Sequence, residues 1–103
     1  MTSRANLAAV WPPTAAVSHR ESDTGYRAVV AVLNDRWRVI ECRDGIQWIL
    51  QRQDAARSLH GAPWRGRSYC RTRAALIRDV GRHAGEISPA AMAILEALPE
   101  RLS

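Results

Sequence analysis

The sequence predicts an α+β fold, in which an antiparallel meander of three strands, with room for a fourth, precedes two helices packed on one face of the sheet. Three short apolar runs are separated by Asn34-Asp35 and Asp44-Gly45, dipeptides typical of tight hairpin turns. Two helix-start signals follow in the last third of the chain. Since all strands precede both helices, packing the helices on one sheet face buries the apolar side of each element. The length of 103 residues suits one such domain.

The three apolar runs span residues 26–33, 36–42 and 46–52. If each turn has two central residues, both hairpins place their large apolar side chains on the same sheet face. That face is predicted to hold Val30, Val32, Trp37, Val39, Ile46, Trp48 and Leu50. The opposite face receives Val29, Ala31, Ile40, Cys42 and Ile49, among Arg38, Gln47 and Gln51. Two turns interpreted independently thus agree on one hydrophobic layer.

Two helices are predicted at the C-terminal end, over residues 73–84 and 89–98. Thr72 is placed as the N-cap of the first helix, and Gly85 is placed to end it. Ser88, followed by a proline, is a second N-cap. The strands and these helices together define the expected core.

The domain organisation follows from the segments without apolar periodicity. Residues 1–25 contain a proline pair and a polar stretch, and they are predicted to form a flexible N-terminal arm. Residues 26–99 are predicted to form the single α+β domain, and residues 100–103 a short tail. Within the domain, residues 53–68 are expected to be a polar loop, and a short strand at residues 67–70 is left open.

The net charge of +5 comes from 15 arginines and no lysine, and it is unevenly distributed. Residues 52–82 contain eight arginines and two aspartates, so their net charge of +6 exceeds that of the whole chain. Arginines neutralise phosphates and aromatic rings stack on bases, which favours DNA or RNA as a partner. The predicted phosphate contacts are Arg65, Arg67, Arg71 and Arg73, and the predicted stacking platforms are Trp64 and Tyr69. The alternative is a solvated basic loop, with Trp64 only covering the sheet edge.

The start of the first helix adds an anion-binding hypothesis. The N–H groups of its first turn lie beside Arg71 and Arg73, and free N–H groups at a helix start attract phosphate or sulfate. The alternative is an ordinary capped helix start.

The second helix suggests a different function, a protein-binding modulator or inhibitor. It is apolar nearly all round, which is more than one core-facing stripe requires. Its predicted contact residues are Met92, Ile94 and Leu95, and a free sheet edge is the other candidate docking surface. The partner would be another protein or a second copy of the chain.

No motif predicts catalysis, a metal site or a cofactor, so we expect a non-enzymatic protein. Cys42, His60, Cys70 and His83 lack the paired spacings of a zinc site, and the two cysteines are expected to be small buried hydrophobes. No segment reaches the ~20 apolar residues of a membrane span, and no signal peptide is indicated. A cytoplasmic protein with reduced thiols is expected.

The stretches RVIECRDGIQWILQR (residues 38–52) and WRGRSYCRTRAALI (residues 64–77) carry a resemblance. They resemble small uncharacterised accessory proteins carried by mobile elements of GC-rich bacteria, and the resemblance spans roughly residues 26–98. That family supplies no established activity and no catalytic residues. What the resemblance implies is a context, accessory genes of mobile DNA, in which nucleic-acid binding or the tuning of another protein is expected.

Overall fold

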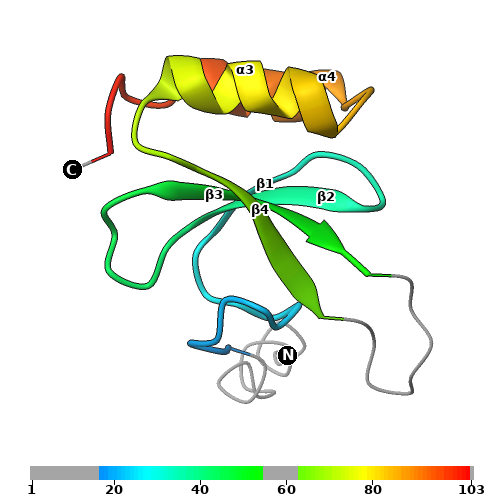
Figure 1. Ribbon diagram of the computed structural model, residues 1–103, viewed down its shortest axis with the longest axis vertical. Coiled ribbons are helices and arrows are strands. Elements are labelled where there is room, and N and C mark those ends of the chain that lie inside the picture. Colours follow the sequence, from blue (N-terminus) through cyan, green and yellow to red (C-terminus); the bar gives the residue numbers. More distant parts are fainter. Residues whose placement is uncertain (1–16, 55–62, 103) are drawn as a thin grey trace, which may run out of the picture.

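The computed structural model describes residues 17–54 and 63–102. Its four strands form one antiparallel sheet in the order β1-β2-β3-β4, and two helices lie side by side over one face of it (Figure 1). The α+β prediction is therefore confirmed, with the fourth strand present. The elements are β1 (Val29–Val32), β2 (Trp37–Glu41), β3 (Trp48–Gln53), β4 (Trp64–Cys70), α3 (Arg73–His83) and α4 (Pro89–Glu96).

The hairpin between β2 and β3 has the predicted register. Its Cα partners include Trp37↔Arg52, Val39↔Leu50 and Glu41↔Trp48. Gly45 adopts the left-handed conformation (φ 69°), and its N–H donates to the carbonyl oxygen of Cys42 at 2.9 Å. Ile46 was predicted on the apolar face, but it lies exposed in this turn and contributes nothing to the core.

The hairpin between β1 and β2 differs from the prediction because its loop has three residues. The side-chain Oδ1 of Asn34 accepts hydrogen bonds from the N–H groups of Arg36 (2.9 Å) and Trp37 (3.1 Å). The loop is then closed by the N–H of Leu33, which donates to the Trp37 carbonyl at 3.0 Å. An asparagine that bonds its own backbone in this way stabilises a longer turn than the dipeptide pattern indicates.

The longer loop shifts the pairing of β1 by one residue next to the turn and so reverses the predicted facing of Ala31 and Val32. A β-bulge then restores the predicted facing of the first two residues of β1, because Val29 pairs with Ile40 and Val30 packs against the helix-side core. Ala31, rather than Val30, lies opposite Val39, and the register shifts between Val29 and Ala31. Val32 was predicted to be buried but is 63% exposed, whereas Ala31 and its neighbour Leu33 are buried. A one-residue slip has this effect because side chains alternate between the two faces of a strand.

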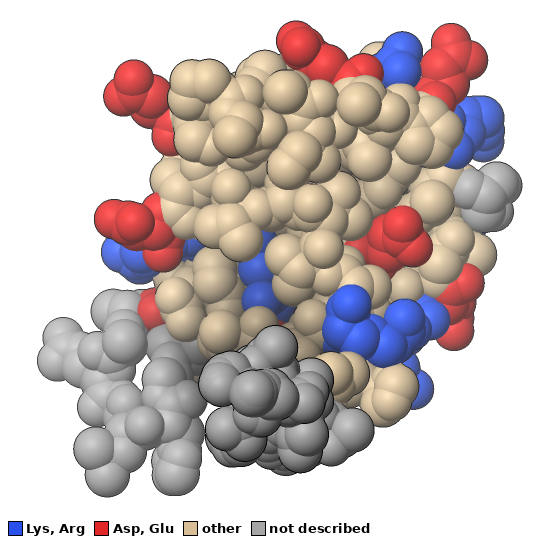
Figure 2. Space-filling view, turned by 180° about the vertical axis from the view of Figure 1, so that it is seen from behind, with Lys and Arg blue, Asp and Glu red and all other residues tan. Residues whose placement is uncertain are grey.

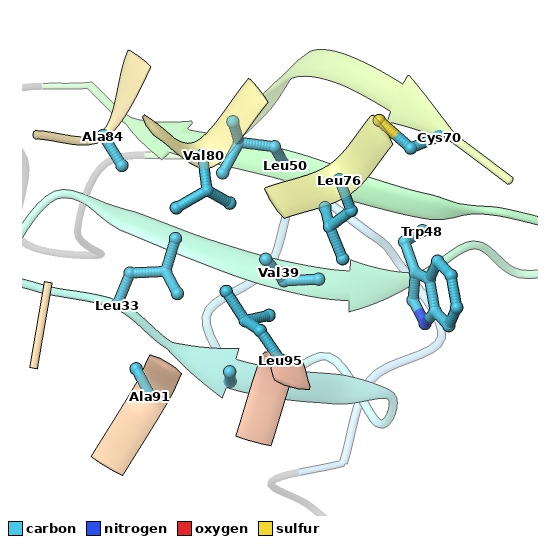
Figure 3. Packing of buried hydrophobic residues seen from close by; sticks show 11 residues of the cluster. Leu33, Val39, Trp48, Leu50, Cys70, Leu76, Val80, Ala84, Ala91 and Leu95 are labelled. Carbon is cyan, nitrogen blue, oxygen red and sulfur yellow. The ribbon is translucent and has the colours of Figure 1, made fainter. Parts of the chain in front are cut away.

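The main core lies between the helices and the sheet, as Figure 3 shows. Trp48 is fully buried in it and Trp37 packs against it, so both indoles lie on the predicted side. The buried members are Ala31, Leu33, Val39, Trp48, Leu50, Cys70, Leu76, Val80, Ala84, Ala91 and Leu95. Leu76 and Val80 come from α3 and Ala91 and Leu95 from α4, so each helix buries one stripe.

Both helix starts are capped as predicted. The Thr72 hydroxyl accepts from the N–H of Ala75 at 3.2 Å, and the Ser88 hydroxyl accepts from the N–H of Ala91 at 3.1 Å. Gly85 follows α3 with a φ of 71°, which is the expected glycine stop. The second helix ends at Glu96, about two residues before the predicted end.

The opposite face of the sheet is covered by residues 18–25, which were predicted to belong to a flexible arm (Figure 1). The N–H of Trp64 donates to the Ser22 carbonyl at 2.9 Å, and Ser18 forms an isolated bridge with Tyr26. The boundary at residue 25 was therefore wrong for this stretch, while residues 1–16 lie outside the described residues. The predicted tail also pairs, since Arg101 bridges Thr72.

Residues 18–25 and the sheet residues that they cover form a second layer, and Arg38 in β2 lies at its centre. Its guanidinium donates to the main-chain carbonyls of Glu21 (3.0 Å), Asp23 (2.8 Å) and Thr24 (3.1 Å), and its Nε donates to Gln51 Oε1 at 2.7 Å. Burial lowers the pKa of Arg38 to about 10, so the group stays charged at neutral pH. A buried cation needs such partners, and the covering loop supplies them through its backbone oxygens.

Candidate nucleic-acid interface

Most of the described arginines of the predicted basic segment lie on β4, just after it, and on α3. The strand β4 begins at Trp64, three residues earlier than the option left open by the sequence, and it forms one edge of the sheet. Its pairing with β3 shifts between Leu50 and Gln51, so Arg67 has no Cα partner there. A bulge on an edge strand changes the direction of its side chains and interrupts the hydrogen bonding between the two strands. Arg67 is exposed at this point.

Trp64 is not the stacking platform predicted from the sequence. It is 8% exposed, and its indole N–H donates to the Thr24 hydroxyl at 3.2 Å. The guanidinium carbon of Arg38 lies over its ring, 4.3 Å from the centroid. Both the polar edge and one ring face are therefore used inside the protein, and this tryptophan belongs to the second layer.

Two of the four predicted phosphate contacts already bind other groups of the chain. Arg65 forms a salt bridge with Asp54 at 2.7 Å, and Arg73 donates to the Leu98 carbonyl at 2.8 Å. The Arg65 pair is exposed, so a phosphate can replace the carboxylate at little cost. In the described part of the chain, Arg67 and Arg71 are exposed and their side chains have no hydrogen-bonding or ionic partner.

The helix α3 adds two arginines that sequence analysis counted in the basic segment but did not assign to the site. Arg78 and Arg82 are exposed and four residues apart, which places them on one side of the helix. The available signal was this i, i+4 spacing. The helix α3 packs against β4, and Arg78 is linked to that strand through Asp79, which contacts Arg78 and accepts a hydrogen bond from Ser68.

One carboxylate lies among these arginines, and it is held by other groups. The hydroxyl of Ser68 in β4 donates to Asp79 Oδ2, and the Arg78 Nε contacts Asp79 Oδ1 at 3.2 Å. The hydrogen bond from Ser68 holds the pKa of Asp79 below its ordinary value, so the group is ionised at neutral pH. Cys70 Sγ lies 3.5 Å from the same oxygen, and burial raises the pKa of its thiol.

The predicted anion site at the start of α3 is already occupied by the chain itself. The N–H of Arg73 donates to the carbonyl of Glu100 at 2.9 Å, and Thr72 caps the N–H of Ala75. Arg73, Glu100 and Arg101 line the hollow at this helix start. The N–H groups of Arg73 and Ala75 are thus already bonded within the chain, which favours the ordinary capped start.

The alternative surface, on α4, is only partly as predicted. Leu95 is fully buried and is excluded as a partner contact, Met92 is half-buried, and Ile94 is 42% exposed. Figure 2 shows a broad uncharged surface over the helical part of the molecule, with charged side chains at its margin. Both edge strands carry a bulge, β1 as well as β4, which makes strand addition at either edge unfavourable.

The remaining chemical groups form no second site among the described residues. Cys42 and Cys70 are free and buried in separate clusters on opposite faces of the sheet. Over residues 17–54 and 63–102, no group of three His, Cys, Asp or Glu side chains is placed to hold a metal ion. Within the same ranges, no helix has the length and apolarity needed to cross a membrane.

The chain is thus a small α+β protein with a basic edge formed by β4 and α3. No protein-family model, curated protein or solved structure matches it. The resemblance to accessory proteins of mobile elements stays a prediction. Function is therefore inferred from the charges and contacts of the described residues.

Proposed function

We propose that this chain is a small non-enzymatic accessory protein that binds the phosphate backbone of nucleic acid along the basic edge formed by β4 and α3. The contacts are Arg67, Arg71 and Arg82, with Arg65 and Arg78 joining when their pairs with Asp54 and Asp79 open. The observation that carries the proposal is that Arg67 and Arg71, within the segment of highest charge, are exposed without a partner among the described residues.

The electrostatic argument concerns counterions. Each arginine that neutralises a phosphate releases a condensed cation, so affinity depends steeply on salt. Within residues 52–82, the described carboxylates, Asp54 and Asp79, are both bonded to other groups of the protein. Neither of these carboxylates is left unpaired to repel an anionic partner from the exposed arginines.

The test is a fluorescence anisotropy titration with labelled DNA and RNA of about 20 nucleotides, repeated between about 50 and 200 mM salt. We expect Arg67→Ala with Arg71→Ala to weaken binding and to lower the slope of log affinity against log salt by about 1.5. The control is Arg27→Ala with Arg43→Ala, which removes the same charge from exposed positions just before β1 and just after β2. No binding at low salt, or an equal effect of the control pair, would overturn the proposal.

A cytoplasmic location belongs to the same proposal. The two free and buried thiols are compatible with a reducing compartment, where disulfides rarely persist.

The second candidate function is self-association through α4, and the uncharged surface in Figure 2 favours it. A two-fold interface places the same surface against itself, so a basic protein can present an uncharged surface to its own copy without bringing like charges together. Exposed Ile94 supplies apolar area on α4, and small Ala90 and Ala93 allow close approach.

Light scattering coupled to gel filtration tests this candidate. We expect a dimer that Ile94→Asp converts to a monomer and that Arg67→Ala with Arg71→Ala leaves intact. A monomer at every concentration of the unaltered protein would exclude self-association through α4.

A further inference from the structure

Tyr69 is exposed in an unusual setting on β4. It is the one aromatic side chain in the described residues with a large exposed fraction, 60%. Its Cα partner is Ile49, a residue of the cluster on the sheet face opposite the helices. The ring is thus presented on a rigid strand, outside both buried layers.

Gly66 makes room for this position of the ring. The tyrosine side chain leans back along the strand, so that a Cβ added at residue 66 would lie 2.7 Å from its Cζ and 3.2 Å from Ile49 Cγ2. Any side chain there would push the ring away. The bulge contributes as well, because the register shift places Gly66 opposite Gln51 and Tyr69 opposite Ile49, on the same face.

Two exposed arginines, Arg67 and Arg71, precede and follow Tyr69 along the chain. Each is two residues away, or about 7 Å in extended backbone. An aromatic ring with an arginine on each side is an arrangement in which a base stacks while its flanking phosphates are neutralised.

We infer that this edge takes single-stranded nucleic acid in preference to duplex, with one unpaired base stacked on Tyr69 and its neighbouring phosphates on Arg67 and Arg71. The inference rests on the proposed function and adds the kind of nucleic acid that the site selects. Duplex bases are already stacked and paired, so their faces cannot reach the ring, whereas any base of a single strand offers one. Little sequence preference is expected, because every base has a π-face.

The experiment compares three ligands of equal length: a thymidine single strand, a duplex, and a single strand of abasic deoxyribose phosphate. The unaltered protein is expected to bind the thymidine strand at least about fivefold more tightly than the other two. Tyr69→Ala should remove that preference and leave the salt dependence unchanged, whereas Tyr69→Phe, which keeps the ring, should retain it. Gly66→Ala, which displaces the ring without removing it, should weaken binding of the thymidine strand alone.

The outcomes separate this inference from the proposed function. Equal affinity for all three ligands, with no effect of Tyr69→Ala, would overturn base stacking while phosphate binding stands. Binding to none of the ligands would overturn both. Tighter binding of duplex than of thymidine strand would also overturn the inference. Circular dichroism and the thermal unfolding temperature of each variant check that the fold is intact.

Discussion

The sheet face beneath α3 and α4 is filled by aliphatic side chains and Trp48. The opposite face combines a smaller apolar cluster (Tyr26, Ile40, Cys42 and Ile49) with the guanidinium of Arg38, which residues 18–25 cover. Both faces exclude water, but by different means. On the helix side, area removed from water supplies the stability. On the other side, an arginine on Trp64 is satisfied by main-chain oxygens, and those bonds hold the covering loop in place. Substitutions on the two faces are therefore expected to differ in how much stability is lost and in where the structure opens.

The largest effect is expected on the helix side. Leu76→Ala removes a fully buried side chain between α3 and the sheet, and the cavity should lower the free energy of unfolding by about 3 kcal/mol. Urea unfolding measures this loss. Ile94→Ala, at an exposed apolar position, is the control and should change stability by less than about 1 kcal/mol. A loss below about 1 kcal/mol for Leu76→Ala would mean that the helices contribute little to the core.

On the opposite face, Arg38→Ala should cost about 2 kcal/mol, because it removes the hydrogen bonds to three part-buried carbonyls and uncovers Trp64. What distinguishes this substitution from Leu76→Ala is a local loss of protection. Amide hydrogen exchange should accelerate over residues 18–27, with the amides of α3 and α4 changed only by the overall loss of stability.

The control is Arg82→Ala, an exposed arginine that should leave both stability and exchange nearly unaltered. If Arg38→Ala speeds exchange uniformly across the chain, the two faces are one cooperative unit and the comparison fails.

The same contrast explains what sequence analysis found. The helix side was predicted well because it depends on signals visible in the chain: the Asp44-Gly45 turn, the Thr72 and Ser88 caps, and the alternation that joins Trp37 to Trp48. The error in β1 arose because Asn34 bonds two backbone N–H groups and lengthens the loop by one residue. A dipeptide pattern does not distinguish these turns.

The covering loop was missed for another physical reason. Arg38 binds it through main-chain oxygens, which every residue possesses, so the sequence of the loop carries no corresponding signal. Trp64 was misassigned as a consequence, since its burial depends on that loop. Within the candidate site, Arg67, Arg71 and Tyr69 were placed correctly on the surface, while the contribution of Arg78 and Arg82 depends on how α3 packs beside β4.

A smaller effect tests the contact between β4 and α3 through pH. Ser68→Ala removes the hydrogen bond that lowers the pKa of Asp79, and it should cost about 1 kcal/mol at pH 7. For a carboxyl whose pKa is lowered on folding, the stabilisation is present above its ordinary value of 3.8 and is lost as pH falls through the folded value. Urea unfolding at several pH values should therefore show the two proteins converging below about pH 4. A difference that persists at low pH would assign the loss to packing instead.

The smallest effects are expected from two glycines on the helix side of the sheet that lie outside its core. Gly81 in α3 and Gly85 after it each have open space where a Cβ would lie, but only Gly85 has a positive φ, 71°. Gly81→Ala should therefore stabilise the protein by about 0.5–1 kcal/mol, since alanine favours helix. Gly85→Ala should destabilise it by about 1 kcal/mol, because alanine is strained in the left-handed region. Thermal unfolding of the two variants measures opposite shifts from the same added methyl group, and shifts of the same sign would contradict the explanation by backbone conformation.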